Sequence, residues 1–178
     1  MDRPVLWNLN WKFYDYFEES LLTEDSGCFA DVNLPHTVKE LPLSYFSHQE
    51  TAMISTYVKT LPVTPQMLEK RIILVFDGVM TYFELFVNGQ KAGEHKGGYS
   101  KSMFDITGSC TEGVNRIVLR VDSHERPDIP PFGYAIDYMT YGGVYRDVWL
   151  YSCSRVFVER ALIRYDLEDK TVILKPEL

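Results

Sequence analysis

The chain has 178 residues, of which 46% are hydrophobic and 24% charged, a balance typical of a globular protein with one well-buried domain. Its formal net charge is -7 and its basic residues are scattered, which argues against a nucleic-acid partner. No apolar run approaches the ~18 residues that a membrane-spanning helix needs, so no membrane partner is expected.

The three cysteines (Cys28, Cys110 and Cys153) are widely spaced, and no C-x-x-C motif occurs. This usage fits reduced, mostly buried thiols in a cytoplasmic protein better than a disulfide framework. Residues 1–9 lack the charged-then-apolar pattern of a secretory signal, which agrees with a cytoplasmic location. The four histidines are not spaced as metal ligands, so we expect neither a metal nor another cofactor.

Alternation of apolar and polar residues dominates the chain, and no segment keeps a helical period for three turns. The strands predicted in chain order are Met53–Leu61, Arg71–Phe76, Thr81–Val87, Gln90–His95, Lys101–Ile106, Arg116–Val121, Val144–Tyr151, Val156–Tyr165 and Thr171–Lys175. Asn88-Gly89 predicts a tight hairpin, because a type I′ turn needs positive φ at both central residues. Any helix is expected to have one or two turns, around Lys39–Phe46 or Pro65–Lys70.

Turn signals lie close together between these short strands. They are Asp77-Gly78, Asn88-Gly89, Gly97-Gly98, Thr107-Gly108 and Glu112-Gly113. Strands that alternate with helices would need longer connections. The predicted fold class is therefore all-β, a two-layered sandwich or jelly roll.

Residues 125–143 differ from the rest of the chain, because they hold three prolines and three glycines with aromatic residues between them. Such a stretch cannot be a regular strand throughout, and we predict a long surface loop. Long ordered loops on a rigid sheet often carry binding function. A change of character near Arg155 divides the chain into residues 1–154 and the start of a second β domain at 155–178, unless this last hairpin belongs to the first sandwich.

Four groups of residues follow one another in a recognisable order. They are Trp11–Phe13 with Val32–Thr37, Phe76–Gly89 with Phe104–Thr107, Asn115–Val121, and Gly142–Leu150 (GGVYRDVWL). Together they resemble the N-terminal sugar-binding domain of glycoside hydrolase family 2, the family of β-galactosidases, β-glucuronidases and β-mannosidases. The resemblance covers about residues 5 to 152.

The resemblance implies a galactose-binding-domain-like jelly roll beside an Ig-like domain and a separate (β/α)₈ barrel of the same polypeptide. The barrel carries the acid/base and the nucleophile of a retaining glycosidase. No barrel-like βα repeat occurs in this chain, so we expect no catalytic residue in it. It would complete the active-site pocket of an enzyme that hydrolyses carbohydrates, with a β-galactoside-like sugar as ligand. Homo-oligomer formation is compatible with this role.

In some β-galactosidases of the family, an Asp six residues before the second Gly of the "GGVYRDV" motif contacts sugar hydroxyls. The corresponding residue is Asp137, with Tyr138 and Tyr141 as expected companions and Tyr134 as a weaker one. A carboxylate accepts charge-assisted hydrogen bonds from two neighbouring hydroxyls, and tyrosine rings offer flat apolar faces to a sugar.

Structural roles for the same residues remain open at this point. Asp137 could instead be a turn residue whose oxygens bond local backbone N–H groups. Tyr138 and Tyr141 could pack in the core or against the barrel. For Arg146 and Asp147, pairing within the chain is favoured over ligand contact, because an arginine in a strand-like run needs acceptors.

One departure from the family pattern concerns the specificity. Such β-galactosidases place a sugar-binding Asn in the segment that here runs Val38–Met53, and this segment contains no Asn. His48 and Gln49 lie in about the right place, but the role is not transferred to them. β-Glucuronidase is the next candidate, because its relatives carry a similar Y-x-G approach to the last strand. Two other classes also stay open: an autonomous carbohydrate-binding module and a purely structural domain.

Overall fold

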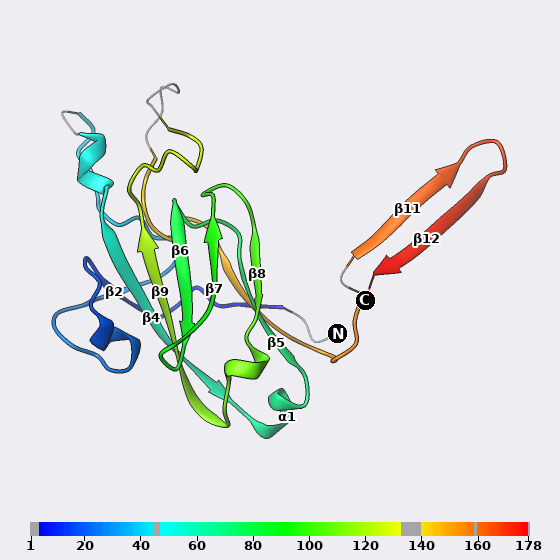
Figure 1. Ribbon diagram of the computed structural model, residues 1–178, viewed down its shortest axis with the longest axis horizontal. Coiled ribbons are helices and arrows are strands. Elements are labelled where there is room, and N and C mark those ends of the chain that lie inside the picture. Colours follow the sequence, from blue (N-terminus) through cyan, green and yellow to red (C-terminus); the bar gives the residue numbers. More distant parts are fainter. Residues whose placement is uncertain (1–3, 45–46, 133–139, 159, 178) are drawn as a thin grey trace.

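The computed structural model describes residues 4–44, 47–132, 140–158 and 160–177. Two antiparallel sheets form a sandwich, and a separate two-stranded hairpin extends from one end of it (Figure 1). The all-β prediction is confirmed. Among the described residues, no helix is long and apolar enough to cross a membrane.

The larger sheet has six strands in the order β3-β2-β4-β9-β6-β7. Their bounds are β2 Trp11–Tyr14, β3 Ala30–Val32, β4 Ile54–Val63, β6 Tyr82–Val87, β7 Gln90–Lys96 and β9 Gly113–Asp122. The predicted hairpin at Asn88-Gly89 is confirmed, since β6 pairs with β7 and both turn residues have positive φ. β4 pairs with β9 along its whole length, so the segment from Ile54 is a central strand of the sheet.

The smaller sheet has four strands in the order β1-β10-β5-β8. Their bounds are β1 Val5–Leu6, β5 Arg71–Phe76, β8 Ser102–Asp105 and β10 Val148–Cys153. β5 is buried on both faces, as its unbroken apolar run predicts. Ile72, Leu74 and Phe76 face the space between the sheets, while Ile73 and Val75 form an outer cluster.

One apolar core fills the space between the two sheets. The six-stranded sheet contributes, among others, Trp11, Tyr57, Phe83, Leu85 and Leu119, all fully buried. Phe76 and Phe83 meet across the sandwich with ring centroids 5.1 Å apart. Tilted aromatic pairs of this kind add to the free energy gained by burying their area. The aromatic-rich composition therefore supplies the interior.

Helical structure is short. α1 (Pro65–Leu68) lies where a helix was predicted, with Thr64 accepting a hydrogen bond from the Met67 N–H. η1 (Glu19–Leu22), η2 (His48–Thr51) and η3 (Thr107–Ser109) are 3₁₀ turns. The prediction of a helix around Lys39–Phe46 is wrong for the described residues 39–44, where Pro42 removes a backbone donor. The turn begins later, at Ser47, which forms a capping box with Glu50.

Two other predictions need correction. The strand expected at Val144–Tyr151 starts at Val148, because residues 144–147 bond singly to different segments: the His36 N–H donates to the Val144 carbonyl and the Asp77 N–H to the Asp147 carbonyl. The thiols are not mostly buried either. The three cysteines form no disulfide with one another, but Cys28 is exposed, Cys110 is half-buried and only Cys153 is buried.

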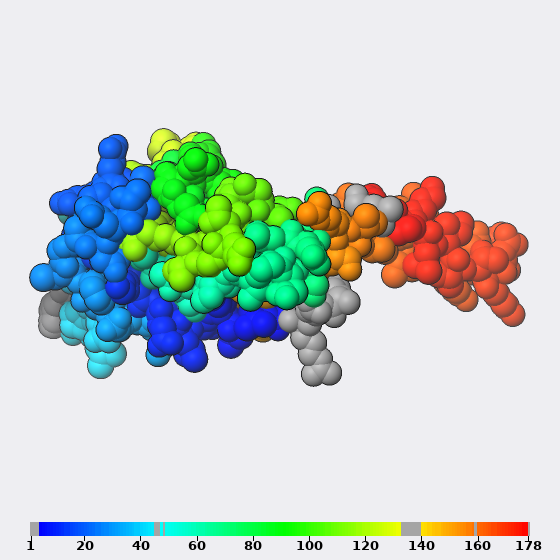
Figure 2. All heavy atoms as spheres, turned by 90° about the horizontal axis from the view of Figure 1, so that it is seen from below, coloured from blue at the N-terminus to red at the C-terminus, as the bar shows by residue number. Residues whose placement is uncertain are grey.

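The C-terminal hairpin consists of β11 (Arg160–Asp166) and β12 (Thr171–Glu177), which pair with each other. Every residue of both strands is exposed. Figure 2 shows the hairpin projecting away from the body of the molecule. One of its faces is entirely apolar, because cross-strand partners share a face. That face consists of Ala161, Ile163, Tyr165, Val172, Leu174 and Pro176.

Candidate functional site

The loop between β9 and β10 carries the predicted sugar contacts. Asp137, Tyr138 and Tyr134 lie outside the described residues, so their roles stay predictions. The described parts of the loop, 125–132 and 140–143, form no strand. Tyr141 is 46% exposed. It lines an open depression of about 650 Å³ together with residues of the segment that follows His36.

The rest of that depression is lined by Thr37, Lys39, Glu40, Leu41, Pro42 and Leu43. Leu43 is fully exposed. Lys39 donates to Glu50 at 3.1 Å. The described lining is thus mostly apolar, with one paired cation and one further carboxylate at Glu40. The family pattern drew attention to a missing Asn in this segment. The lining role of its apolar residues, Leu41, Pro42 and Leu43, was therefore not predicted.

The C-terminal arm of the loop is anchored by buried backbone contacts at Gly142-Gly143. The Val38 N–H donates to the Gly142 carbonyl at 3.0 Å, and Gly143 exchanges two hydrogen bonds with Met80 at 3.0 and 3.2 Å. Gly143 has φ +105, where side chains are rarely tolerated. A Cβ there would lie 2.6 Å from the Tyr57 hydroxyl and 2.8 Å from the His36 carbonyl oxygen. This arm is therefore fixed against the core.

His36 and Tyr57 lie against this arm on its core side. Their side chains hydrogen-bond at 2.9 Å between Nδ1 and the hydroxyl. Burial lowers the pKa of His36 and raises the pKa of Tyr57. Both groups therefore stay neutral near pH 7, and the pair acts as a rigid support that carries no charge.

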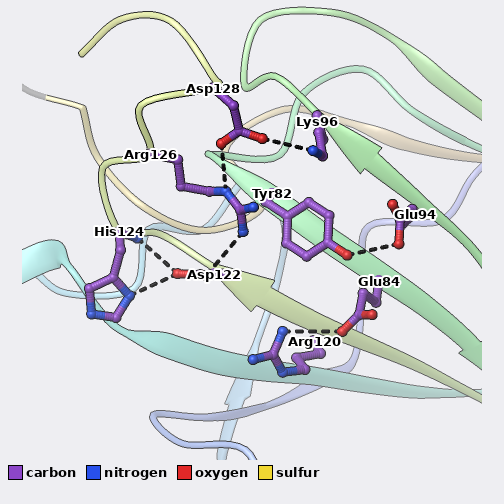
Figure 3. Close-up of polar contacts among 9 residues, drawn as sticks. All are labelled: Tyr82, Glu84, Glu94, Lys96, Arg120, Asp122, His124, Arg126 and Asp128. Atoms are coloured by element: carbon purple, nitrogen blue, oxygen red, sulfur yellow. Dashed lines mark hydrogen bonds and ion pairs between the residues drawn. The ribbon is translucent and has the colours of Figure 1, made fainter.

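The N-terminal arm of the loop is anchored differently, by charged side chains on the surface (Figure 3). Asp128 accepts from Lys96 Nζ at 2.7 Å and from Arg126 Nε at 3.3 Å. These two cations lower the pKa of Asp128 to about 2. The Arg126 guanidinium also lies over the Tyr82 ring, 4.8 Å from its centroid, and 3.8 Å from Asp122.

A second charged group continues along the same face of the sheet (Figure 3). Glu84 pairs with Arg120 at 3.1 Å and with Lys91 at 2.6 Å, and Glu94 accepts from the Tyr82 hydroxyl at 2.9 Å. Acidic and basic groups alternate across this surface. It therefore lacks the uniform positive charge that a polyanion would need.

Arg146 and Asp147 contact other parts of the chain, as structural pairing requires. Asp147 accepts from the Asn8 side-chain amide at 2.7 Å. Arg146 points its Nη1 toward the carbonyls of Asp77 and Tyr99 at 3.5 and 3.4 Å. Among the described residues, no three His, Cys, Asp or Glu side chains gather closely enough to hold a metal ion.

Comparison with known proteins places these features in a family. The model for the sugar binding domain of glycosyl hydrolases family 2 matches residues 23–154. A β-galactosidase of Thermoanaerobacterium thermosulfurigenes is 42% identical over 157 residues, covering 85% of this chain and 22% of the relative. A β-glucuronidase of Bacteroides fragilis is 35% identical over 149 residues, covering 83% of this chain and 20% of the relative.

The solved structures agree with the sequence relatives. A β-glucuronidase of an uncultured Clostridium species superimposes with a TM-score of 0.80 at 25% identity, over 98% of this chain and 33% of that one. The chain spans about a fifth of the length of the curated relatives that it matches. It belongs to glycosyl hydrolases family 2, within which residues 23–154 form the sugar binding domain.

Proposed function

We propose that this chain is the non-catalytic N-terminal part of a retaining β-glycosidase, and that its loop at residues 125–143 completes the sugar pocket of a separate barrel. The observation that carries the proposal is the position of Tyr141, which lines an open depression between two anchored segments. An open depression is what a shared pocket leaves when one of its walls belongs to another module. In this proposal Asp137 accepts hydrogen bonds from sugar hydroxyls, and Tyr138 is its companion in sugar binding.

A neutral β-galactoside is the preferred substrate in this proposal. A glucuronide carries a carboxylate, and its recognition needs an available cation. In the described lining the cation is Lys39, which is paired with Glu50 at 3.1 Å, and Glu40 adds negative charge. The two first β-galactosidase relatives are 40% and 42% identical, against 35% for the two β-glucuronidase relatives, which also favours the galactoside.

The same proposal assigns residues 155–178 to the start of a further β domain. An isolated hairpin is at best marginally stable in water, and an apolar face needs a partner. The exposed face with Ile163, Tyr165, Val172 and Leu174 fits a sheet that another part of the polypeptide covers. The solved structure of one relative matches 98% of this chain and is about three times as long. This agreement supports the assignment.

The decisive experiment changes Asp137 in the full-length polypeptide. We expect Asp137→Asn to lower kcat/KM for p-nitrophenyl β-galactoside about ten- to a hundredfold, because hydrogen bonds to a charged group contribute about 1.5–3 kcal/mol. The control is Asp31→Asn, an exposed carboxylate on β3. Unchanged kinetics in a folded Asp137→Asn protein would instead support a purely structural domain.

A second experiment separates a pocket wall from an autonomous binding module. The isolated chain should hydrolyse no glycoside and should bind galactose too weakly for calorimetry at millimolar sugar, because half of the pocket is absent. A measurable heat of binding by the chain alone would favour the autonomous module.

A further inference from the structure

Strand β6 begins, and its neighbours β7 and β9 end, at the rim of the sheet beneath the N-terminal arm of the loop. Tyr82 on β6 lies directly opposite Lys96 on β7 and directly opposite Asp122 on β9. Residues opposite one another in a sheet share a face, so these three side chains form one row across three strands. We call Lys96, Tyr82 and Asp122 the docking row.

Two residues of the loop meet this row in matching order (Figure 3). Asp128 binds Lys96 at one end, at 2.7 Å. Arg126 lies over the Tyr82 ring in the middle and reaches toward Asp122 at the other end, at 3.8 Å. A reverse turn between them, with the Ile129 N–H donating to the Arg126 carbonyl at 3.1 Å, brings both side chains to the sheet. Ile129 itself is 2% exposed.

We propose that Arg126 and Asp128 are positioning residues, which dock on this row and fix where the chain enters residues 133–139. This inference rests on the proposed function, because the consequence concerns sugar contacts made by that segment. The other arm is already fixed by Gly142-Gly143 against the core. The docking row is the second attachment, and it sets the affinity for sugar without touching the sugar.

The next row of the same sheet provides an internal control. Glu84 lies opposite Glu94 and opposite Arg120, two residues along from Tyr82. Its partner Lys91 is on β7, as Lys96 is. The ion-pair distance is 2.6 Å for Lys91 and 2.7 Å for Lys96, and the two side chains are 42% and 52% exposed. The carboxylates that Lys91 contacts lie within the sheet, whereas the partner of Lys96 lies on the loop.

The first test is kinetic and uses the full-length polypeptide with p-nitrophenyl β-galactoside. Exposed ion pairs have small energies, so we expect Lys96→Met and Asp128→Asn to raise KM about two- to fivefold and leave kcat nearly unchanged. The double variant should match Asp128→Asn alone, because the contact that Lys96→Met removes is already lost in Asp128→Asn. Salt should raise the wild-type KM toward that of the variants. Lys91→Met should leave KM at the wild-type value.

The second test is independent of activity and uses the chain itself. Chymotrypsin cleaves after aromatic residues, and residues 132–141 contain several of them. Cleavage there, followed by mass spectrometry, should be several-fold faster in Lys96→Met and Asp128→Asn than in Lys91→Met. Equal cleavage rates or equal KM values for the Lys96 and Lys91 variants would overturn the positioning role. Unchanged kinetics in Asp137→Asn would overturn the proposed function instead, whatever the cleavage rates.

Discussion

The sandwich and the C-terminal hairpin are built from the same kind of strand but differ completely in burial. Phe83 on β6 is fully buried and contacts the rings of Phe76 and Phe104 on the opposite sheet, whereas Tyr165 on β11 is 58% exposed. In both strands every second residue is apolar, whereas the intervening positions are mixed. The comparison teaches that a period of two predicts a strand, while the surface that the strand buries depends on what else is present to cover it.

Truncation of one aromatic residue in each region should give the largest difference in the free energy of unfolding. Phe83→Ala should cost about 3–5 kcal/mol of unfolding free energy, because it leaves a cavity among packed rings. Tyr165→Ala should change it by no more than about 0.5 kcal/mol in this chain. Chemical denaturation measures both, and Phe83→Leu serves if the alanine variant does not fold. Similar losses in the two variants would show that the hairpin packs on the sandwich.

At the rim of the sandwich, Gly143→Ala should be the next most damaging change. The residue has φ +105, and an added Cβ meets the His36 carbonyl oxygen at 2.8 Å. Backbone strain of this kind costs about 1–3 kcal/mol before any clash is counted. Gly108→Ala is the control, because nothing lies within 4 Å of its Cβ position. If both variants melt at the same temperature, the Gly142-Gly143 anchor is not rigid.

His36 should give the sandwich a pH dependence that the hairpin lacks. Its pKa in the folded state lies below the ordinary value of 6.5, because burial disfavours the imidazolium. As the pH falls, His36 is therefore protonated in the unfolded chain before it is protonated in the folded chain. The free energy of unfolding decreases below about pH 6.5 for this reason. One proton limits the slope to about 1.4 kcal/mol per pH unit. The stability difference between wild type and His36→Gln, measured at pH 7.5 and 5.5, should shrink at the lower pH; a constant difference would contradict this.

Removal of residues 155–178 should have the smallest effect on stability. The described residues of β11 and β12 pair only with each other. The deleted segment does contact the sandwich through Arg155, which donates to the Leu68 and Glu69 carbonyls, and through Phe157, which packs beside Ile73 and Val75. These contacts are at the surface, so the melting temperature of the sandwich should fall by no more than a few degrees. Self-association should decrease, because the apolar face and unpaired strand edges are removed. Analytical ultracentrifugation and thermal melts measure the two effects. A collapse of the melting temperature would place the hairpin in the first domain.

Much of the fold could be predicted from local patterns. The β6–β7 hairpin follows from Asn88-Gly89, and the doubly buried strand β5 follows from the run of apolar residues at 72–76. Short strands such as β1 and β3 could not be found, because two or three residues do not establish a period. The start of β10 at Val148 could not be predicted either, because Val144 and Asp147 make their backbone hydrogen bonds with residues distant in sequence.

The candidate site was predictable only through the family resemblance. It indicated Asp137, Tyr138 and Tyr141, and of these Tyr141 is described and lines the depression. The docking row was not predictable, because the alignment of Lys96, Tyr82 and Asp122 depends on strand register. The spacing Arg126-x-Asp128 alone is indistinguishable from ordinary surface charge. The cytoplasmic location stays a prediction.

The most direct test of the central claim is a crystal structure of the full-length polypeptide with a galactose-configured inhibitor. We expect the sugar to lie between the barrel and the loop at residues 125–143. The Asp137 carboxylate should then be within hydrogen-bond distance of two sugar hydroxyls, and Tyr141 should line the same pocket. A sugar enclosed by the barrel alone, with this loop turned away from it, would contradict the proposed role.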